Sequence, residues 1–380
     1  MGEVGEVGEV VVAPRSVKEV QEAVRSAPLL LPRGGGSKWG LAGLGAAADG
    51  RALVLLDTRG LAGVVEYEPS EFTFTALAGT PVAEVEALLA RHGQYLPFDP
   101  PFVGDGATLG GTIAAGLSGP CRLRYGGVRD FILGILFVDG EGRPVRGGGK
   151  VVKNAAGFDL PKLFCGSRGR LGVIVEATFK VFPRPRAYAT VRLPFQRLAD
   201  AASTLRRLLR SPLEPHAADL VPPGWLAGEY SLLVRVGGQE DVLRSALGRV
   251  EELAGLPGER LTGESEAALW QRLRDVAWAP EQAAVVRIHM LPSLLEAVDA
   301  VLERPGAARH YSVGGNVAWA AFADPPDWDA LERELRRLQV AATVLRGPPR
   351  GRVWLTGLSG ANFAGRVKAA LDPHGRFGAL

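Results

Sequence analysis

Two glycine-rich stretches of the chain supply residues that could bind a large flat or anionic ligand. The first, Arg33-Gly34-Gly35-Gly36-Ser37-Lys38, sets three glycines between two cations. Free backbone amides there can face a diphosphate, and the cations offset its charge. The second, Gly104 to Gly119, is almost all Gly, Ala, Thr and Ser, so few side chains keep a ligand from its backbone. For this second stretch alone, a glycine-rich bend between strands is an equal alternative.

The glycines of the chain do not match the two common glycine-loop fingerprints. Gly40, Gly43 and Gly45 are spaced GxxGxG rather than GxGxxG, and the GGGK at 147–150 lacks the upstream glycine and the Ser/Thr of a P-loop. A Rossmann or P-loop protein is therefore disfavoured.

Buried strands must hold the second glycine-rich stretch in place. Phe131 to Gly140 is a continuous apolar run closed by Asp-Gly, and Leu171 to Pro183 is a β-branched run stopped by proline. They bracket the motif KNAAGFD at 153–159, so the glycines are mounted on a sheet. Upstream, the pattern predicts strands at 10–13, 29–31, 52–57 and 72–77 and helices starting near Val17 and over 82–89.

Composition excludes several classes of protein. The 380 residues are enough for two domains, and a net charge of +3 with mixed signs indicates no nucleic-acid partner. Two cysteines without CxxC spacing fit free thiols in a reducing compartment. No apolar run is long enough to span a membrane, and the acidic GEV repeats at the N-terminus do not fit a signal peptide. We expect a cytoplasmic protein.

Several motifs in order over about 180 residues give a specific resemblance. RGGGSK, then DPPFVGDGATLGGTIAAGLSGP, RYGGVRD, KNAAGFDL and GSRGRLGVI are similar to the vanillyl-alcohol-oxidase-type (PCMH-type) FAD-binding flavoproteins. Within them the chain most resembles the FAD-binding subunits of bacterial glycolate oxidases. The resemblance implies an α+β fold: a two-subdomain FAD-binding domain and a ferredoxin-like antiparallel-sheet cap. It implies domains at 1–185 and 186–346, and a segment at 347–380 that returns to the FAD domain.

The resemblance also implies the flavin contacts. The segment Gly34–Lys38 would hold the pyrophosphate, 108–112 and 115–119 would follow the pyrophosphate and isoalloxazine, and 172–174 would lie near the adenosine. The implied FAD-binding residues are Arg33, Gly34, Gly35, Gly36, Ser37, Lys38, Trp39, Pro100, Thr108, Gly110, Gly111, Thr112, Ala115, Gly116, Ser118, Gly119, Gly172, Val173 and Ile174. A side chain at Gly35 or Gly111 is expected to obstruct FAD while leaving the protein folded, since both are predicted in exposed loops.

Three departures from the family pattern matter. Arg168 and Arg170 stand in GSRGRLG where many relatives have GSEGTLG, which adds positive charge beside the dinucleotide. Ser37 and Lys38 occupy the loop where covalent flavoproteins carry an attaching histidine, so FAD is expected to be non-covalent. The closing Asn-Pro-Gly is absent after Phe377, so a looser tail is expected.

After two prolines around Arg184, the chain alternates strands and helices. We predict strands near 187–193, 217–221, 230–236, 283–289, 309–312, 316–322 and 340–345, and helices over 197–210, 239–254, 264–276, 292–303 and 327–339. Two split βαβ-like halves forming an antiparallel sheet, with helices on one face, are the economical arrangement.

Catalytic residues are the weakest signal in the sequence. Catalytic relatives commonly carry HxGDGNxH in the cap, whereas the stretch at 310–319 has one histidine and no acidic residue, and no metal site is expected. Arg287 and His289 lie two residues apart on one strand face and are candidates to bind a carboxylate and accept a proton. A structural pair is the alternative.

Three functions follow. The favoured one is an FAD-binding subunit of a glycolate oxidase-type complex, serving electron transfer or assembly beside a catalytic flavoprotein subunit and an iron–sulfur subunit, peripheral to the inner membrane through those partners. The second is a self-sufficient FAD-dependent dehydrogenase of a small 2-hydroxy acid such as glycolate or D-lactate. The third is a scaffold subunit that has lost its flavin.

Overall fold

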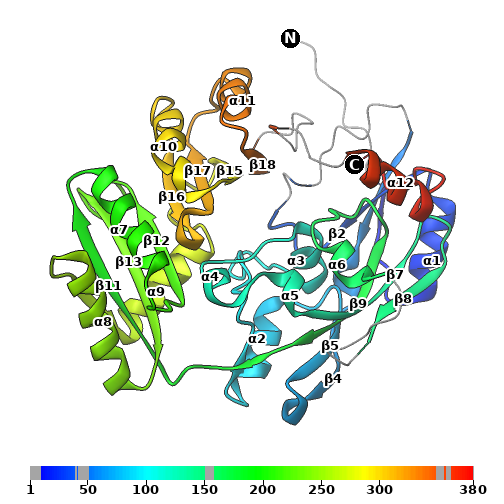
Figure 1. The fold of residues 1–380 in the computed structure, drawn as a ribbon. Helices are drawn as coiled ribbons and strands as arrows, with labels where there is room; N and C mark the ends of the chain where they lie inside the picture. The colour runs from blue at the N-terminus through cyan, green and yellow to red at the C-terminus, as the bar shows by residue number, and fades with distance from the viewer. Residues whose placement is uncertain are drawn as a thin grey trace.

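The computed structural model describes residues 10–38, 41, 51–149, 158–347, 355–356 and 361–379. The described chain forms two halves (Figure 1). The loop half contains residues 10–183 and 361–379, and the sheet half contains residues 187–346. One apolar core cluster contains residues from both halves, so the two pack directly against each other.

A three-stranded parallel sheet opens the loop half. Its strands lie in the order β1 (Val10–Val12), β3 (Leu53–Asp57) and β2 (Leu29–Arg33). Helix α1 (Val17–Ser26) begins after Ser16, whose Oγ accepts a hydrogen bond from the Glu19 amide at 3.2 Å. Strand β2 runs directly into Arg33, so this sheet positions the first glycine loop.

A five-stranded antiparallel sheet carries the second glycine-rich stretch. Its order is β4 (Val64–Glu68), β5 (Thr73–Leu77), β9 (Val173–Lys180), β7 (Ile132–Val138) and β8 (Pro144–Gly148). Short helices surround it: α2 (Val82–Ala90), α3 (Leu109–Ala115), α4 (Arg122–Tyr125), α5 (Val128–Phe131) and α6 (Leu160–Phe164). A two-residue pairing of β6 (Gln94–Tyr95) with β10 (Phe182–Pro183) precedes the crossing into the sheet half.

Helix α3 corrects the expectation that the second glycine-rich stretch is an exposed loop. The Thr108 hydroxyl caps the helix by accepting a hydrogen bond from the Gly111 amide, and Gly116 ends it with φ +64°. Leu109 and Ile113 are fully buried. A cap, a terminator and two buried side chains therefore outweigh the low helix propensity of the glycines.

The sheet half is one eight-stranded antiparallel sheet, which confirms the predicted α+β fold class. Its order is β14 (Glu259–Thr262), β11 (Ala187–Phe195), β13 (Tyr230–Gly238), β12 (Ala217–Val221), β16 (Ala308–Ser312), β17 (Val317–Phe322), β15 (Ala284–His289) and β18 (Ala341–Arg346). Its helices are α7 (Leu198–Arg210), α8 (Glu240–Ala254), α9 (Gly263–Arg274), α10 (Leu295–Glu303) and α11 (Trp328–Arg337).

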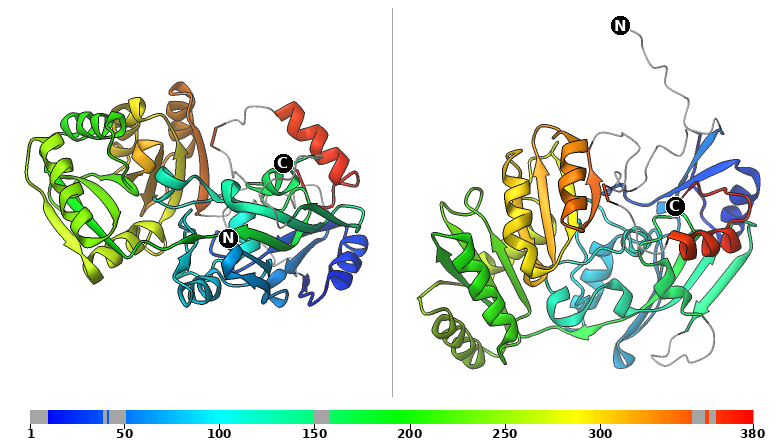
Figure 2. Two further views of the ribbon diagram at one scale, coloured as in Figure 1. Left: turned by 60° about the horizontal axis from the view of Figure 1, so that its bottom comes forward. Right: turned by 45° about the horizontal axis from the view of Figure 1, so that its top comes forward.

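The two faces of this sheet meet different surroundings. Helices α7, α8, α10 and α11 share a core with one face, as Figure 2 also shows. Helix α9 departs from the expected arrangement, because its Trp270 and Leu273 belong to the core on the opposite face, which faces the loop half. On β15, Val286 and Ile288 pack against the helices, so strand alternation turns Arg287 towards the loop half.

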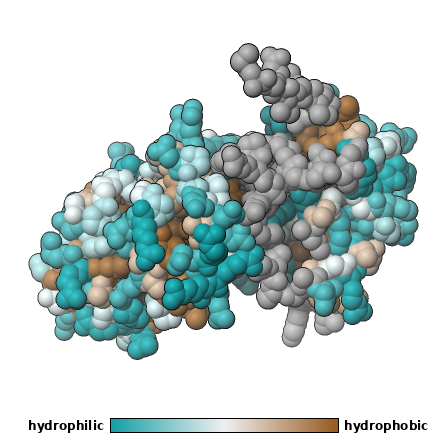
Figure 3. Space-filling view, turned by 90° about the horizontal axis from the view of Figure 1, so that it is seen from above, coloured by the Kyte–Doolittle hydropathy of each residue, from teal (hydrophilic) through white to brown (hydrophobic). Residues whose placement is uncertain are grey.

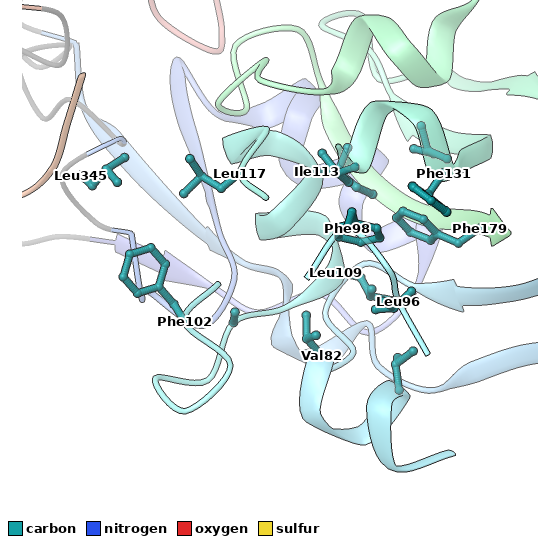
Figure 4. Packing of buried hydrophobic residues seen from close by; sticks show 14 of the residues in the cluster. Val82, Leu96, Phe98, Phe102, Leu109, Ile113, Leu117, Phe131, Phe179 and Leu345 are labelled. Carbon is teal, nitrogen blue, oxygen red and sulfur yellow. The ribbon is translucent and has the colours of Figure 1, made fainter. Parts of the chain in front are cut away.

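Polar contacts also join the halves. The Val103 amide donates to Asp275 Oδ1 at 3.1 Å, and Arg124 Nη1 donates to the Glu214 carbonyl at 2.7 Å. In Figure 4, Phe102 and Leu117 lie on the side of the loop-half core that faces Leu345 of β18.

The segment from 361 to 379 packs against the loop half. After helix α12 (Ala361–Leu371), the Leu30 amide of β2 donates to the Arg376 carbonyl at 2.7 Å, and the Phe377 amide donates to Asp372 Oδ2 at 2.9 Å. Phe377 is fully buried. The expectation of a loose tail is therefore wrong, because these contacts do not need the missing Asn-Pro-Gly.

The outer surface of the sheet half is mostly hydrophilic on the face that Figure 3 shows, with scattered apolar residues. Among the helices of the described ranges, none has the length and apolar character needed to cross a bilayer.

Candidate functional site: two adjoining cavities

The first cavity lies where β2, α3 and β9 meet, and we call it the glycine-walled cavity. It encloses about 790 Å³, including the part open to solvent. The predicted residues that line it are Arg33, Gly34, Gly35, Gly36, Ser37, Lys38, Thr108, Gly110, Gly111, Ala115, Gly172 and Ile174. Three segments far apart in the sequence thus form one wall.

Close backbone packing explains why glycines stand here. A Cβ at Gly35 would lie 1.8 Å from the Gly106 carbonyl oxygen, and one at Gly34 would lie 2.2 Å from Thr108 Oγ1. These glycines let the two loops touch. Gly111 differs: its Cβ would meet only Thr108 Oγ1, at 3.1 Å, within 4 Å. The expectation that a side chain at Gly35 leaves the fold intact is therefore wrong, whereas for Gly111 it stays a prediction.

The glycine-walled cavity is cationic. Arg33, Lys38 and Arg168 line it, and none of its described lining residues carries a carboxylate. Burial lowers the pKa of Lys38 to about 8; nearby Asp105 opposes this shift and Arg346 adds to it. Burial also lowers the pKa of Arg168 to about 9, with a further contribution from Arg170. Cations held in a poorly solvated wall favour an anionic ligand.

Not every predicted FAD-binding residue lies on a cavity wall. Pro100, Thr112, Gly119 and Val173 line neither cavity, and Trp39 lies outside the described residues, as does most of KNAAGFD. Val173 is fully buried on the side of β9 opposite Ile174, because neighbouring residues of a strand face opposite ways. At Gly119 a Cβ would lie 2.4 Å from the Asp99 carbonyl oxygen, so packing alone requires glycine there.

The second cavity adjoins the first, and we call it the arginine-walled cavity. It encloses about 1140 Å³, including the part open to solvent, and shares Leu41, Ala115 and Arg168 with its neighbour. The loop half contributes Gly116, Ser118, Arg122, Arg129 and Asp130, and the sheet half contributes Arg287, His289, Thr343 and Leu345. The structure therefore brings both catalytic candidates beside the predicted flavin-binding residues Gly116 and Ser118.

Arg287 and His289 are in direct contact. Arg287 Nη1 donates to His289 Nε2 at 2.9 Å, while Nε and Nη2 of Arg287 are buried without a hydrogen-bond partner among the described residues. Burial, followed by the charge of Arg122, lowers the pKa of Arg287 to about 9. Its poorly solvated position and the charges of Arg287 and Arg122 lower the pKa of His289 to about 3, although its ring opens to the cavity. His289 is therefore neutral near pH 7.

Some wall residues were not predicted. Arg168 was noted as a departure from the family pattern but not as part of the site. Arg122 lies two residues before the RYGGVRD motif and Arg129 lies within it, and neither has a local signal of its role. Thr58 and Ala78 follow strands β3 and β5, and the only clue to them was that position.

The cysteines and the other histidines give no second centre. Cys121 is buried, and its burial raises the pKa of its thiol, which fits the expected free thiol. Burial raises the pKa of Cys165 to about 12. Within the described ranges, no group of three His, Cys, Asp or Glu side chains could hold a metal ion.

The chain is similar in sequence to proteins of known families. The FAD binding domain family matches residues 8–148. Glycolate oxidase subunit GlcE of Escherichia coli K12 is 38% identical over 259 residues, which cover 68% of this chain and 67% of GlcE. The chain belongs to the GlcE family of FAD-binding, PCMH-type flavoproteins. It therefore binds FAD.

Other relatives of this GlcE-family chain match smaller parts of their own length. Glycolate oxidase subunit GlcD of Bacillus subtilis is 29% identical over 54% of the chain and 43% of GlcD. A D-lactate dehydrogenase of Archaeoglobus fulgidus is 33% identical over 54% of the chain and 45% of that enzyme. The chain thus spans less than half of these two proteins.

Solved structures share the fold. A structure of p-cresol methylhydroxylase with substrate bound has a TM-score of 0.73 at 14% identity and covers 97% of this chain and 87% of that one. An alkyldihydroxyacetonephosphate synthase has a TM-score of 0.68 at 20% identity, covering 96% and 75%. The predicted PCMH-type fold is confirmed.

Proposed function

We propose that this GlcE-family chain is the FAD-binding subunit of a glycolate oxidase-type complex. The observation that carries the proposal is the pair of adjoining cavities: one suits the diphosphate of FAD, and the other has cationic walls beside it. In this assignment Arg33 to Lys38 and Thr108 to Gly111 bind the diphosphate, and Ala115 to Ser118 flank the isoalloxazine. FAD is held non-covalently, because Ser37 and Lys38 stand where an attaching histidine would be.

Electron transfer or assembly fits this chain better than independent catalysis. When bound, FAD supplies a two-electron acceptor. A 2-hydroxy acid also needs a base for its hydroxyl proton, and a base works best with a pKa near the working pH. The poorly solvated position of His289 and the charges of two arginines lower its pKa to about 3, which makes it a weak base. A partner flavoprotein would then supply catalysis, and an iron–sulfur subunit would take up electrons.

A self-sufficient 2-hydroxy-acid dehydrogenase is the second candidate, favoured by the contact between Arg287 and His289. Arg287 would bind the carboxylate of glycolate or D-lactate, and His289 would accept the hydroxyl proton. The third possibility, a scaffold without flavin, is opposed by the family assignment and by the intact glycine walls.

Anaerobic mixing separates the two candidates. The isolated flavin-loaded chain is mixed with millimolar glycolate or D-lactate while flavin absorbance is followed, alone and with co-purified partner subunits. We expect bleaching of the isolated chain to be about 100- to 10,000-fold slower than with partners, the typical loss without a general base. Rapid bleaching of the isolated chain would establish the dehydrogenase instead.

A further inference from the structure

Two arginines from different halves of the molecule line the arginine-walled cavity, and their positive charges repel each other. Arg122 comes from α4 of the loop half and Arg287 from β15 of the sheet half. Arg122 contributes to lowering the pKa of Arg287 after burial, so the two guanidiniums are close enough to repel. Among the residues that the structure describes, neither forms an ion pair with a carboxylate.

Such an arrangement is unfavourable without an anion. Arg287 is only 5% exposed, and two of its donor nitrogens are buried with no partner in the part of the chain that the structure describes. Unpaired buried donors and unpaired buried charge both destabilise a protein, and the nearby second cation adds repulsion. A carboxylate accepts hydrogen bonds from two guanidiniums and removes all three costs. Within the described ranges, the hydrogen-bond acceptor of Arg287 is the uncharged His289.

We propose that Arg122 and Arg287 together bind one carboxylate of a small organic acid, so that the ligand connects the two halves of the molecule. This inference rests on the proposed function, since it concerns the cavity beside the predicted flavin site. It adds a ligand-binding role for Arg122, which the sequence did not indicate.

The other charged groups of the cavity do not replace that anion. Asp130 is the one carboxylate among the described lining residues, and its Oδ2 already accepts a hydrogen bond from the Gly127 amide at 2.7 Å. Arg129 is exposed, and Arg168 adds positive charge from the shared wall. The thiol of Cys165, whose pKa burial raises to about 12, stays uncharged. The net charge of the lining is positive.

Anion binding has a protonation signature. The poorly solvated position is the largest cause of the lowered pKa of His289, and the charges of Arg287 and Arg122 add to it. A carboxylate that offsets both charges therefore raises this pKa above about 3 but leaves it below the ordinary value of about 6.5. Between the two values, binding should take up protons. Near pH 5 the uptake is a fraction of a proton for each ligand bound, and above about pH 7 it vanishes.

The test is calorimetric titration of the FAD-loaded chain with oxalate, a small acid that resists flavin oxidation. We expect Arg122→Gln to weaken oxalate binding by about 10- to 100-fold, the usual effect of losing a charged hydrogen-bond donor. Arg129→Gln is the matched control, because it removes an exposed arginine of the same cavity, and we expect a change below about threefold. Titration near pH 5 in two buffers of different ionisation enthalpy measures proton uptake, and His289→Gln should abolish it.

A second variant distinguishes ligand binding by Arg287 from misfolding and from a purely structural role. Arg287→Met removes a buried cation with unpaired donors, so it should bind oxalate at least tenfold more weakly while its apoprotein melts at the same or a higher temperature. A structural Arg287 would instead lower the melting temperature.

Other results would overturn the inference. They are unchanged oxalate affinity in Arg122→Gln, no proton uptake near pH 5, or loss of FAD rather than of oxalate in Arg122→Gln, which would assign the arginine to the flavin. The proposed function fails separately: a wild-type chain without flavin that still binds oxalate through Arg122 would refute the flavin subunit and keep the anion site.

Discussion

The two adjoining cavities use different parts of the chain to form their walls. In the glycine-walled cavity the backbone shapes the site, since Gly34 and Gly35 let two loops approach more closely than any side chain allows. In the arginine-walled cavity, side chains from both halves define the site. A site shaped by backbone depends on short stretches of sequence, whereas a site shaped by side chains depends on how the halves pack. The first should therefore tolerate movement of the sheet half, and the second should not.

The largest expected effect is a loss of FAD that is confined to the glycine-walled cavity. Gly111→Val places a branched side chain in the glycine wall without meeting backbone, so FAD content should fall at least about 100-fold while the chain stays folded. The absorbance ratio of flavin to protein and circular dichroism measure this. Gly365→Val, on α12 where a Cβ meets nothing within 4 Å, is the control and should retain FAD. Full flavin content in Gly111→Val would remove the diphosphate from this wall.

A substitution on the shared wall should affect both sites. Arg168 lines both cavities, and Arg168→Gln should weaken both FAD and oxalate by about tenfold, since one charge contributes to each. Fluorescence titration of apoprotein with FAD and calorimetry with oxalate measure the two. A loss confined to one ligand would show that Arg168 serves a single cavity.

The pH dependence of FAD affinity should report the glycine-walled cavity alone. Burial lowers the pKa of Lys38 to about 8, and a bound diphosphate favours its charged form. Raising the pH through this value removes the charge from the free protein, so FAD affinity should fall about five- to tenfold between pH 7 and pH 9. Titrations at several pH values test this, and Lys38→Met should lose the dependence. A flat profile in the wild type would show that Lys38 does not contact the diphosphate.

The smallest effect concerns backbone conformation. Gly36 has φ +74°, and a Cβ there meets nothing within 4 Å. Gly36→Ala should therefore destabilise the apoprotein by about 1 kcal/mol through left-handed strain, with no clash in the wall. Urea unfolding measures the change. A loss above about 3 kcal/mol would mean that the first loop packs more tightly than its contacts indicate.

The sequence predicted the elements whose apolar patterns are local. Strand 217–221 has the predicted bounds, and the strands around Arg287 and Val317 lie within a residue of theirs. Two of the missed strands lack such a pattern: β14 reads ERLT with mostly exposed side chains, and β8 reads PVRGG, which is typical of a turn. Strand β4 reads VVEYE and was missed although its residues favour a strand. Helix α3 was missed because its glycines have low helix propensity, whereas its cap and its buried side chains stabilise the helix.

The residues of the two cavities were predicted or missed for the same reason. Most of the glycine-walled cavity was named in advance because 33–38 and 108–115 are contiguous motifs. Arg122 was not named in advance, because α4 has only four residues. Arg287, with which it is proposed to bind a carboxylate, is 165 positions away in the sequence. The packing of α4 against the sheet half, where it contacts β12, accompanies the placement of both arginines on one cavity.

The contact between β2 and the segment after α12 has a consequence for synthesis. Strand β2, which leads into the first glycine loop, donates a backbone hydrogen bond from Leu30 to the Arg376 carbonyl, and Phe377 packs in the core beside it. On the ribosome, the loop half therefore stays incomplete until the whole sheet half has been made. We expect FAD to be captured after translation rather than during it, and ribosome-bound chains stalled before Ala361 should retain no flavin.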